Sequence, residues 1–337
     1  MPFHKLSIIV MPILLAQATA GCVLPDFGKS SNPLPPGGEG GIGGSGSAGV
    51  TGSSGSGGGT GGGGTGGATS ASIVPKISAG GFYTCGLKTN ATIACWGDNS
   101  CGQSTPPVST FTDVDAGYDH TCGVKTDGSI VCWGSAVASN NYGQTTPPPG
   151  LFTQVSSGTL YSCGMKDDGT VVCWGFNGSG QATAPGGIFT SVSAGNDHTC
   201  ALKLDGAVAC WGANNSSQCT PPAGAFIQVS AGDSHTCGVR SDGTVACWGD
   251  NGLGESSPPA GTFTQISAGS NYTCGIKTDR TVTCWGPSLV SVTSPPAGSF
   301  TQISAGAAHA CGLKTDGTVA CWGRSDSGQC TPPAGPF

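Results

Sequence analysis

Charged residues are scarce in this chain, at 9% of its 337 residues, and only 12 of them are Lys or Arg. The net charge is −6 and no basic run is present, so the chain lacks the positive patch on which nucleic-acid binding depends. After the N-terminus, no apolar run reaches the roughly 18 residues that a membrane-spanning helix needs. We therefore expect neither a nucleic-acid partner nor a membrane-spanning helix in the body of the chain.

Catalytic motifs are missing as well. The sequence contains no nucleophile elbow, no metal-binding helix and no phosphate-binding loop followed by a helix. Acidic residues do occur in predicted loops, and a pair of carboxylates could support hydrolysis if the fold brought them together. The sequence favours a protein that is not an enzyme and that uses no cofactor and no metal.

The N-terminus has the features of an export signal, which we place at residues 1–21. A short basic region precedes the apolar stretch Leu6–Leu15, and small residues follow it. Gly21-Cys22 resembles the lipobox of bacterial lipoproteins, in which the cysteine is lipidated, although Thr19 stands where a leucine is usual. We predict a bacterial outer-membrane or cell-surface lipoprotein anchored through Cys22, with plain secretion as the alternative. Residues 22–72 are rich in Gly and Ser and predict a flexible tether.

Cysteine and tryptophan are regularly placed in the rest of the chain. A cysteine is followed ten residues later by a second cysteine and then by Trp-Gly, and this pattern occurs seven times. The copies are 37 residues apart, except for one step of 41 residues. The pairs are Cys85/Cys95, Cys122/Cys132, Cys163/Cys173, Cys200/Cys210, Cys237/Cys247, Cys274/Cys284 and Cys311/Cys321. A repeat of this length is typical of a propeller, a solenoid or an array.

The fourth copy indicates why each pair should form a disulfide. Two runs that alternate large and small residues flank Asp205-Gly206, which is a hairpin signal. A three-residue turn places Leu202 opposite Val208 and Cys200 opposite Cys210. Opposed residues in antiparallel strands lie about 4.5–5.5 Å apart, within the range that a disulfide accepts. The sequence therefore predicts one cross-strand disulfide in each copy, consistent with export to an oxidising compartment.

Two further segments complete each unit. Residues 189–193 predict a strand that leads into the hairpin, and a segment with Pro-Pro or Ala-Pro after the Trp-Gly loop predicts a short outer strand, because proline is confined to sheet edges. Four antiparallel strands per unit indicate the blades of a β-propeller. We expect an all-β, seven-bladed propeller over residues 73–337. Phe337 matches the Phe that opens each unit, so strands from the two ends should close the ring.

The repeat Ser-Ala-Gly-x-x-His-Thr-Cys-x-Leu-Lys-x-Asp-Gly-x-Val-x-Cys-Trp-Gly, followed by Gly-Gln, resembles that of the regulator of chromosome condensation family. It is most similar to the cysteine-bearing variants of exported bacterial proteins. The resemblance covers about residues 73–337 and implies a seven-bladed propeller. It does not carry over guanine-nucleotide exchange, because no inserted wedge matches and an exported protein would not meet a cytosolic GTPase.

One slot of the repeat could suggest metal binding. It holds Tyr83, His120, Tyr161, His198, His235, Tyr272 and His309, two residues before the first cysteine. Tyrosine in three of the seven positions favours a structural hydrogen-bonding role over a metal site. Three more cysteines, Cys101, Cys219 and Cys330, lie outside the pairs. A Cys101–Cys330 staple across the ring closure is one hypothesis, with Cys219 then left as an odd thiol.

The copies diverge mainly in two sets of loops, and strand direction places both sets on one face. Variable loops on a rigid scaffold are where binding is usually found. The candidate binding residues are Phe82, Tyr118, Asp119, Tyr142, Asn196, Asp197, Asp233 and Asn271. We predict a monomeric binding module for a protein partner at the cell exterior, held to the membrane only by its lipid anchor. A carbohydrate-binding lectin and an enzyme-inhibiting propeller are the alternatives.

Overall fold

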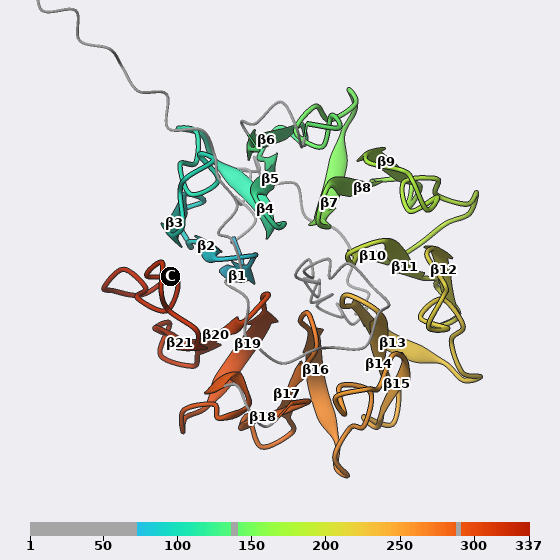
Figure 1. Ribbon diagram of the computed structural model, residues 1–337. Coiled ribbons are helices and arrows are strands. Elements are labelled where there is room, and N and C mark those ends of the chain that lie inside the picture. The colour runs from blue at the N-terminus through green and yellow to red at the C-terminus, as the bar shows by residue number, and fades with distance from the viewer. Residues whose placement is uncertain (1–72, 136–140, 288–290) are drawn as a thin grey trace, which may run out of the picture.

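Seven three-stranded antiparallel sheets surround a central axis in the computed structural model of the chain, which describes residues 73–135, 141–287 and 291–337 (Figure 1). The expected all-β class and the seven blades are confirmed. The blades are β1–β3 (Lys76–Ala79, Tyr83–Leu87, Ile93–Gly97), β4–β6 (Phe111–Ala116, His120–Lys125, Ile130–Gly134), β7–β9 (Phe152–Ser157, Tyr161–Lys166, Val171–Gly175), β10–β12 (Ser191–Ala194, His198–Leu202, Val208–Gly212), β13–β15 (Phe226–Ala231, His235–Arg240, Val245–Gly249), β16–β18 (Phe263–Ala268, Thr273–Lys277, Val282–Trp285) and β19–β21 (Phe300–Ala305, His309–Lys314, Val319–Gly323). A 3₁₀ helix, η2 (Ser291–Thr293), precedes the last blade.

The predicted hairpin register is confirmed. In the fourth blade Leu202 pairs with Val208 and Cys200 with Cys210. Gly206 closes the turn with a φ of 81°, a left-handed conformation that glycine adopts without steric penalty. The register therefore follows from local turn chemistry.

All seven predicted disulfides are present. Their Cα–Cα distances are 4.0–4.1 Å, slightly shorter than the spacing that the sequence led us to expect. They join Cys85 to Cys95, Cys122 to Cys132, Cys163 to Cys173, Cys200 to Cys210, Cys237 to Cys247, Cys274 to Cys284 and Cys311 to Cys321.

The two cysteines of each disulfide differ in burial, which the sequence did not predict. The first lies on the middle strand of its blade and is fully buried. The second lies on the third strand, which is the outer edge of the sheet in the described residues, and is only half-buried. The half-buried cysteines are Cys95, Cys132, Cys173, Cys210, Cys247, Cys284 and Cys321. No fourth strand extends the sheet in the described residues. The third strand is therefore less covered than it would be in the four-stranded blade that we expected.

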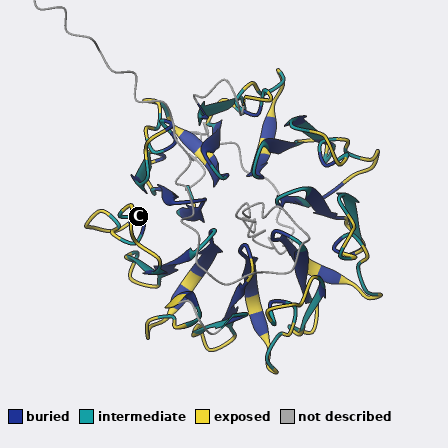
Figure 2. Ribbon diagram, viewed as in Figure 1, coloured by how far each residue is buried: buried dark blue, intermediate teal, exposed yellow. Residues whose placement is uncertain are grey.

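The core of the protein lies between the blades. Figure 2 shows the innermost strands buried along most of their length, while the outer turns are exposed. One cluster joins Tyr83, Cys85 and Leu87 of β2 to Phe111 and Val114 of β4. Because each blade is covered by a neighbour on both sides, both faces of its strands are apolar.

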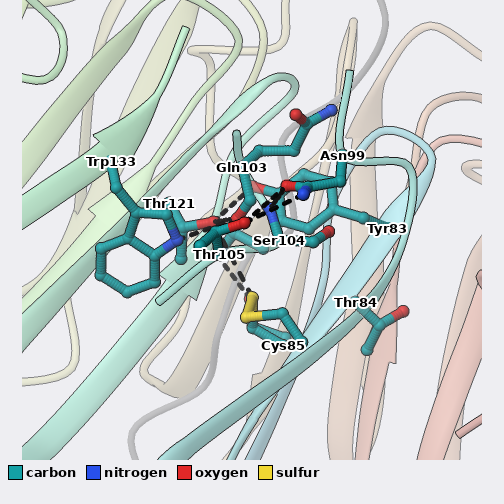
Figure 3. The surroundings of a disulfide bond; sticks show 12 residues. Tyr83, Thr84, Cys85, Asn99, Gln103, Ser104, Thr105, Thr121 and Trp133 are labelled. Atoms are coloured by element: carbon teal, nitrogen blue, oxygen red, sulfur yellow. Dashed lines mark hydrogen bonds between the residues drawn. A yellow bond between two sulfur atoms is a disulfide. The ribbon is translucent and has the colours of Figure 1, made fainter. Parts of the chain in front are cut away.

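The predicted fourth strand is not formed in the described residues. The proline-containing segments that follow the Trp-Gly loops are turns and irregular chain instead. Their hydrogen bonds go to the next blade rather than to a sheet edge. The Gln103 carbonyl accepts the indole N–H of Trp133 at 2.9 Å and the hydroxyl of Thr121 at 2.9 Å (Figure 3). Proline has no N–H to donate to a ladder, so this segment links two blades instead of widening one.

Hydrogen bonds between the innermost strands join the blades into a ring. At six of the seven joints a serine hydroxyl accepts the N–H of an alanine on the next blade, as in Ser78 to Ala116 at 2.9 Å. The joint from the last blade to the first uses the same bond, from Ser304 to Ala79, also at 2.9 Å. At the remaining joint Asp115 replaces serine and accepts the N–H of Ser157 at 2.7 Å. The ring is therefore continuous through side-chain bonds, although no sheet of the described residues crosses a joint.

The C-terminal residue completes the first blade. Phe337 is 4% exposed, and its ring lies 5.8 Å from that of Trp96 in an edge-on contact. A Cβ added to Gly86 would lie 2.3 Å from the Phe337 ring, as one added to Gly123 would lie 2.7 Å from Phe111. Phe337 thus occupies in the first blade the place that Phe111 has in the second. Within the described residues the two ends of the propeller meet by packing, and the paired strands that the sequence led us to expect are not formed.

Replacing this residue should weaken the closure of the ring. We expect Phe337→Ala to lower the free energy of unfolding by about 3–5 kcal/mol, because it removes a buried aromatic ring that the neighbouring blade cannot replace. Chemical denaturation followed by tryptophan fluorescence measures the change. Phe300→Ala is the matched control, since Phe300 packs on Trp322 in the same way at 6.2 Å inside the ring. A loss for Phe337→Ala far below that for Phe300→Ala would show that the closure contributes little to stability.

No helix in the described part of the chain is long and apolar enough to cross a membrane. The predicted signal peptide at 1–21, the predicted lipidation site Cys22 and the predicted tether at 22–72 lie outside the described residues.

Candidate functional site

Two sets of loops form one face of the propeller, as the strand directions predicted. We call it the variable face, comprising the residue pairs before each second strand and the loops that begin after each Trp-Gly. Backbone hydrogen bonds join the two sets within a unit, for example from the Asp98 N–H to the Phe82 carbonyl at 2.9 Å. Equivalent bonds join Ser135 to Asp119 and Ala213 to Asp197, each at 2.8 Å. The hairpin turns lie at the opposite ends of the same strands, on what we call the turn face.

The histidine and tyrosine slot is structural. The His198 Nε2 atom lies 2.8 Å from the Thr236 hydroxyl of the next blade, and the Tyr161 hydroxyl donates to the His198 carbonyl at 2.6 Å. Burial lowers the pKa of His198 to about 3, with a smaller contribution from His235. The pKa of His235 and that of His309 fall to about 4 for the same main reason. These three imidazoles are therefore neutral at pH 7 and act as blade-to-blade hydrogen-bonding groups.

Within the described residues no group of three or more His, Cys, Asp and Glu side chains is arranged to hold a metal ion. The hairpin cysteine pairs are disulfide-bonded, which removes the thiolates that zinc would require. This holds for the half-buried second cysteines as well as for the buried first ones, so both sets belong to the scaffold.

Two of the predicted binding residues form an aromatic pair between the first and second blades. The Phe82 and Tyr118 rings meet edge to face with centroids 6.1 Å apart. Phe82 is 8% exposed, less than its place in a variable loop suggested. The guanidinium of Arg324, from the last blade, lies 5.5 Å from the Phe82 centroid. Burial raises the pKa of Tyr118 to about 12, and the negative charges of Asp119, Asp98 and Asp233 add to the shift.

Asp119 lies beside this aromatic pair and is almost fully buried, at 3% exposed. Neither of its carboxylate oxygens has a hydrogen-bond partner in the described structure. The nearest basic atom is Nδ1 of His120, 3.9 Å from Oδ1, which is beyond hydrogen-bond distance. A buried carboxylate without a donor is rare in folded proteins and calls for a functional or structural reason.

Three more predicted residues lie together on the fourth and fifth blades. Asp197 accepts the side-chain amide of Gln181 at 3.0 Å, and burial raises its pKa. Asp233 is 7% exposed, and burial followed by the charge of Asp197 raises its pKa well above the usual range. Asn196 is half-buried and donates its backbone N–H to the Gly232 carbonyl at 3.2 Å. These acids share the variable face with Tyr118, and the charge of Asp233 contributes to the raised pKa of Tyr118.

Tyr142 and Asn271 are not part of these clusters. Tyr142 is 49% exposed and packs edge-on against Phe176 at 4.8 Å. Asn271 is exposed on the sixth blade. The structure therefore divides the predicted set into buried and half-buried residues around the acids, the exposed Tyr142 and one isolated amide.

Sequence reasoning missed two residues beside the Phe82 and Tyr118 pair: Asp98, which is half-buried, and Arg324, which is exposed. The Asp98 side chain accepts the amide of Gln103 at 2.9 Å and the hydroxyl of Ser100 at 2.9 Å. Arg324 lies over Phe82 only because the ring closes, which brings the last blade beside the first. Both residues occupy the same slot after Trp-Gly, where the other copies have Ser, Phe, Ala, Asp and Pro. That divergence is the signal that could have identified them.

The turn face carries the hairpin turns and one shallow depression. Lys125 and Asp127 of one turn form an ion pair at 3.1 Å on the protein surface. An open depression of about 510 Å³ on this face is lined by Ile188, Lys203, Leu204 and Asp205.

The cysteines outside the hairpin pairs do not form the predicted staple. Cys219 and Cys330 are free thiols in the described structure, so the hypothesis of a Cys101–Cys330 bond is wrong. Each thiol lies 3.2 Å from a carbonyl oxygen of its own loop, Cys219 from that of Ala213 and Cys330 from that of Arg324. Ser104 makes the same bond to the Asp98 carbonyl, at 2.6 Å. Burial raises the pKa of Cys219 to about 11, so this thiol is protonated at pH 7 and a poor nucleophile.

Comparison with known protein families gives one match, repeated around the ring. The profile of the regulator of chromosome condensation (RCC1) repeat matches residues 75–103, 111–144, 152–181, 189–218, 226–255, 263–286 and 300–329. Each matched segment corresponds to one blade. No match was found among curated protein sequences.

Several solved structures are similar. The CRINKLY WD40 ectodomain of the receptor kinase ACR4 from Arabidopsis thaliana is 31% identical with a TM-score of 0.62, over 73% of this chain and 94% of that one. The ectodomain of the receptor kinase CR4 from Physcomitrella patens is 25% identical with a TM-score of 0.62, over 74% and 73%. Prp20p from Saccharomyces cerevisiae, at 15% identity and a TM-score of 0.55 over 62% and 71%, shares the fold.

Proposed function

The chain belongs to the regulator of chromosome condensation (RCC1) repeat family, and we propose that it is an exported, non-enzymatic binding module that recognises a protein partner through its variable face. The observation that carries this proposal is the contrast between scaffold and loops. The groups that join the blades recur around the ring, while the variable-face pair differs in every copy. A rigid scaffold with one divergent loop face is the usual arrangement of a recognition surface.

Placement outside the cell is part of the proposal. Seven disulfides form and persist in oxidising compartments, and cytosolic reductants would open them. Two of the similar solved structures are ectodomains of receptor kinases, which supports the same placement. We further propose that the lipid anchor at Cys22 and the 22–72 tether hold the propeller near a membrane surface.

A lectin is the second candidate, and the aromatic pair of Tyr142 and Phe176 favours it. Tyr142 is 49% exposed and packs on the half-buried Phe176 on the variable face, and exposed aromatic rings commonly stack on sugars. If the protein is a lectin, it should bind on a glycan array, and Tyr142→Ala combined with Phe176→Ala should abolish that binding. Absence of binding by the unmodified protein would contradict the lectin hypothesis.

Site-specific photo-crosslinking tests the principal proposal. A benzoylphenylalanine is placed at Tyr142 or Asn271 on the variable face, and at Leu204, which is 87% exposed, on the turn face. The full protein is then irradiated with the extracellular proteins of its source. We expect one discrete adduct from the two variable-face positions and none from Leu204. Adducts only from Leu204 would show that the turn face is the recognition surface.

A further inference from the structure

The repeat supplies its own control for the buried carboxylate of Asp119. Asp197 occupies the same slot two blades further on, and there Gln181 donates its side-chain amide to the carboxylate at 3.0 Å. Asp119 has no such donor, and both of its oxygens are buried without a partner among the described residues. Asp119 and Asp197 are therefore equivalent in the repeat but differ in the hydrogen-bond donors around them.

At the Asp119 site the equivalent glutamine amide is hydrogen-bonded to a different acid. Gln103, the counterpart of Gln181, donates its amide to Asp98 at 2.9 Å instead. Asp98 stands in the slot that Phe176 fills beside Gln181, so only the first of these two sites contains a competing carboxylate. At the first site the single glutamine amide therefore goes to the acid of the loop, whereas at the other site it goes to Asp197.

Aromatic rings complete the surroundings. Tyr118 and Phe82 meet at 6.1 Å beside these acids, and the charges of Asp119 and Asp98 both act on the Tyr118 hydroxyl. The Arg324 guanidinium already lies 5.5 Å from the Phe82 centroid, so a planar cation fits against this ring. A net charge of −6 on the whole chain would favour the approach of a cation.

We infer that Asp119 and Asp98, with Tyr118 and Phe82, bind an arginine side chain presented by the protein partner. This inference rests on the proposed function. A guanidinium can donate two hydrogen bonds to one carboxylate and stack on an aromatic ring, which matches the groups present. A metal ion fits less well, because the described residues provide no set of three ligands. The free oxygens of Asp119 would then be satisfied by the partner.

Titration of the intact protein with short peptides tests this assignment. The probes are Gly-Ser-Arg-Ser-Gly and the same peptide with citrulline, which has the shape of arginine but no charge. Binding is followed by nuclear magnetic resonance of the backbone amides of Asp98, Tyr118 and Asp119. We expect saturable shifts with the arginine peptide and at least a tenfold weaker effect with citrulline. Equal responses to the two peptides would overturn the inference.

Two substitutions make the test specific. Asp119→Asn should weaken binding of the arginine peptide at least tenfold, whereas Asp197→Asn, the matched control in the same slot, should leave it unchanged. Asp119→Asn should leave the melting temperature within a few degrees of the parent value, because asparagine has the shape of aspartate and no hydrogen bond to the carboxylate is lost. The variant therefore stays folded, and unchanged binding in it would contradict the inference.

The outcome separates this inference from the proposed function. A partner that crosslinks to Tyr142 or Asn271 but binds Asp119→Asn normally would leave the proposed function standing and refute the arginine site. Loss of the partner in Asp119→Asn, with retention in Asp197→Asn, supports both.

Discussion

Reduction of the seven hairpin disulfides is expected to unfold the protein at neutral pH. Each bond closes a loop of about 11 residues, and the chain-entropy model assigns about 2.5–3 kcal/mol to a loop of that length. Together the seven amount to roughly 20 kcal/mol, more than the usual 5–15 kcal/mol of net stability. The first cysteine of every pair is fully buried, so reduction must be carried out in denaturant before dilution. Near-UV circular dichroism then measures whether native packing returns in the presence of the reductant.

Two variants make this prediction quantitative. Removing one disulfide, as in Cys200→Ala with Cys210→Ala, should lower the free energy of unfolding by about 2.5–3 kcal/mol. Replacing the two free thiols, Cys219→Ser with Cys330→Ser, should change it by less than about 0.5 kcal/mol. The hydroxyls of Ser104 and Ser256 already make the equivalent bond, each at 2.6 Å. A native near-UV spectrum in the fully reduced protein would show that blade packing suffices without the disulfides.

Acidification is expected to destabilise the protein steeply below about pH 6.5. The folded-state pKa values of His198, His235 and His309 are about 3, 4 and 4, below the ordinary value near 6.5. Their contribution to stability is complete above pH 6.5 and is lost as the pH falls, because only the unfolded chain then binds the three protons. Three protons correspond to about 4 kcal/mol per pH unit. The raised pKa values of Asp233 and Asp197 oppose this loss toward pH 4.

Melting temperatures measured between pH 7.5 and 4.5 test the acid prediction. His198→Tyr is the matched variant. Every tyrosine in this slot precedes a blade that has a histidine in the same slot, and His198 likewise precedes the blade of His235, so a tyrosine suits this position. The variant should fold, with a hydroxyl donating to the His235 carbonyl as Tyr161 donates to that of His198, and should lose about one third of the pH slope. A slope unchanged by the substitution would mean that other groups cause the acid sensitivity.

The fold was largely predictable because its determinants are local. Gly206 fixes the turn, the turn fixes the register, and the register places Cys200 opposite Cys210. The fourth strand was predicted wrongly, because a proline-rich segment can equally well bond through its carbonyls to side chains of the next blade. Trp133 and Thr121 provide those donors from 30 and 18 residues away, and sequence patterns do not show such partners.

The candidate site was predictable only in outline. Loop divergence identified the variable face and named Phe82 and Asp119, but both are nearly buried. Their burial depends on packing between blades, which the alternation of residues within one strand does not report. Arg324 joins Phe82 only through closure of the ring.

The sequence by itself determined the seven repeats, the hairpin register and the disulfide partners, since each depends on residues close together in the chain. Only the tertiary structure decided which carboxylate would be left without a donor. Gln103 lies five residues after one acid, Asp98, and before another, Asp119. Its side-chain amide donates to Asp98, whereas the amide of Gln181 donates to Asp197. The choice depends on which acceptors the packed loops bring within about 3 Å, and the buried carboxylate of Asp119 is its consequence.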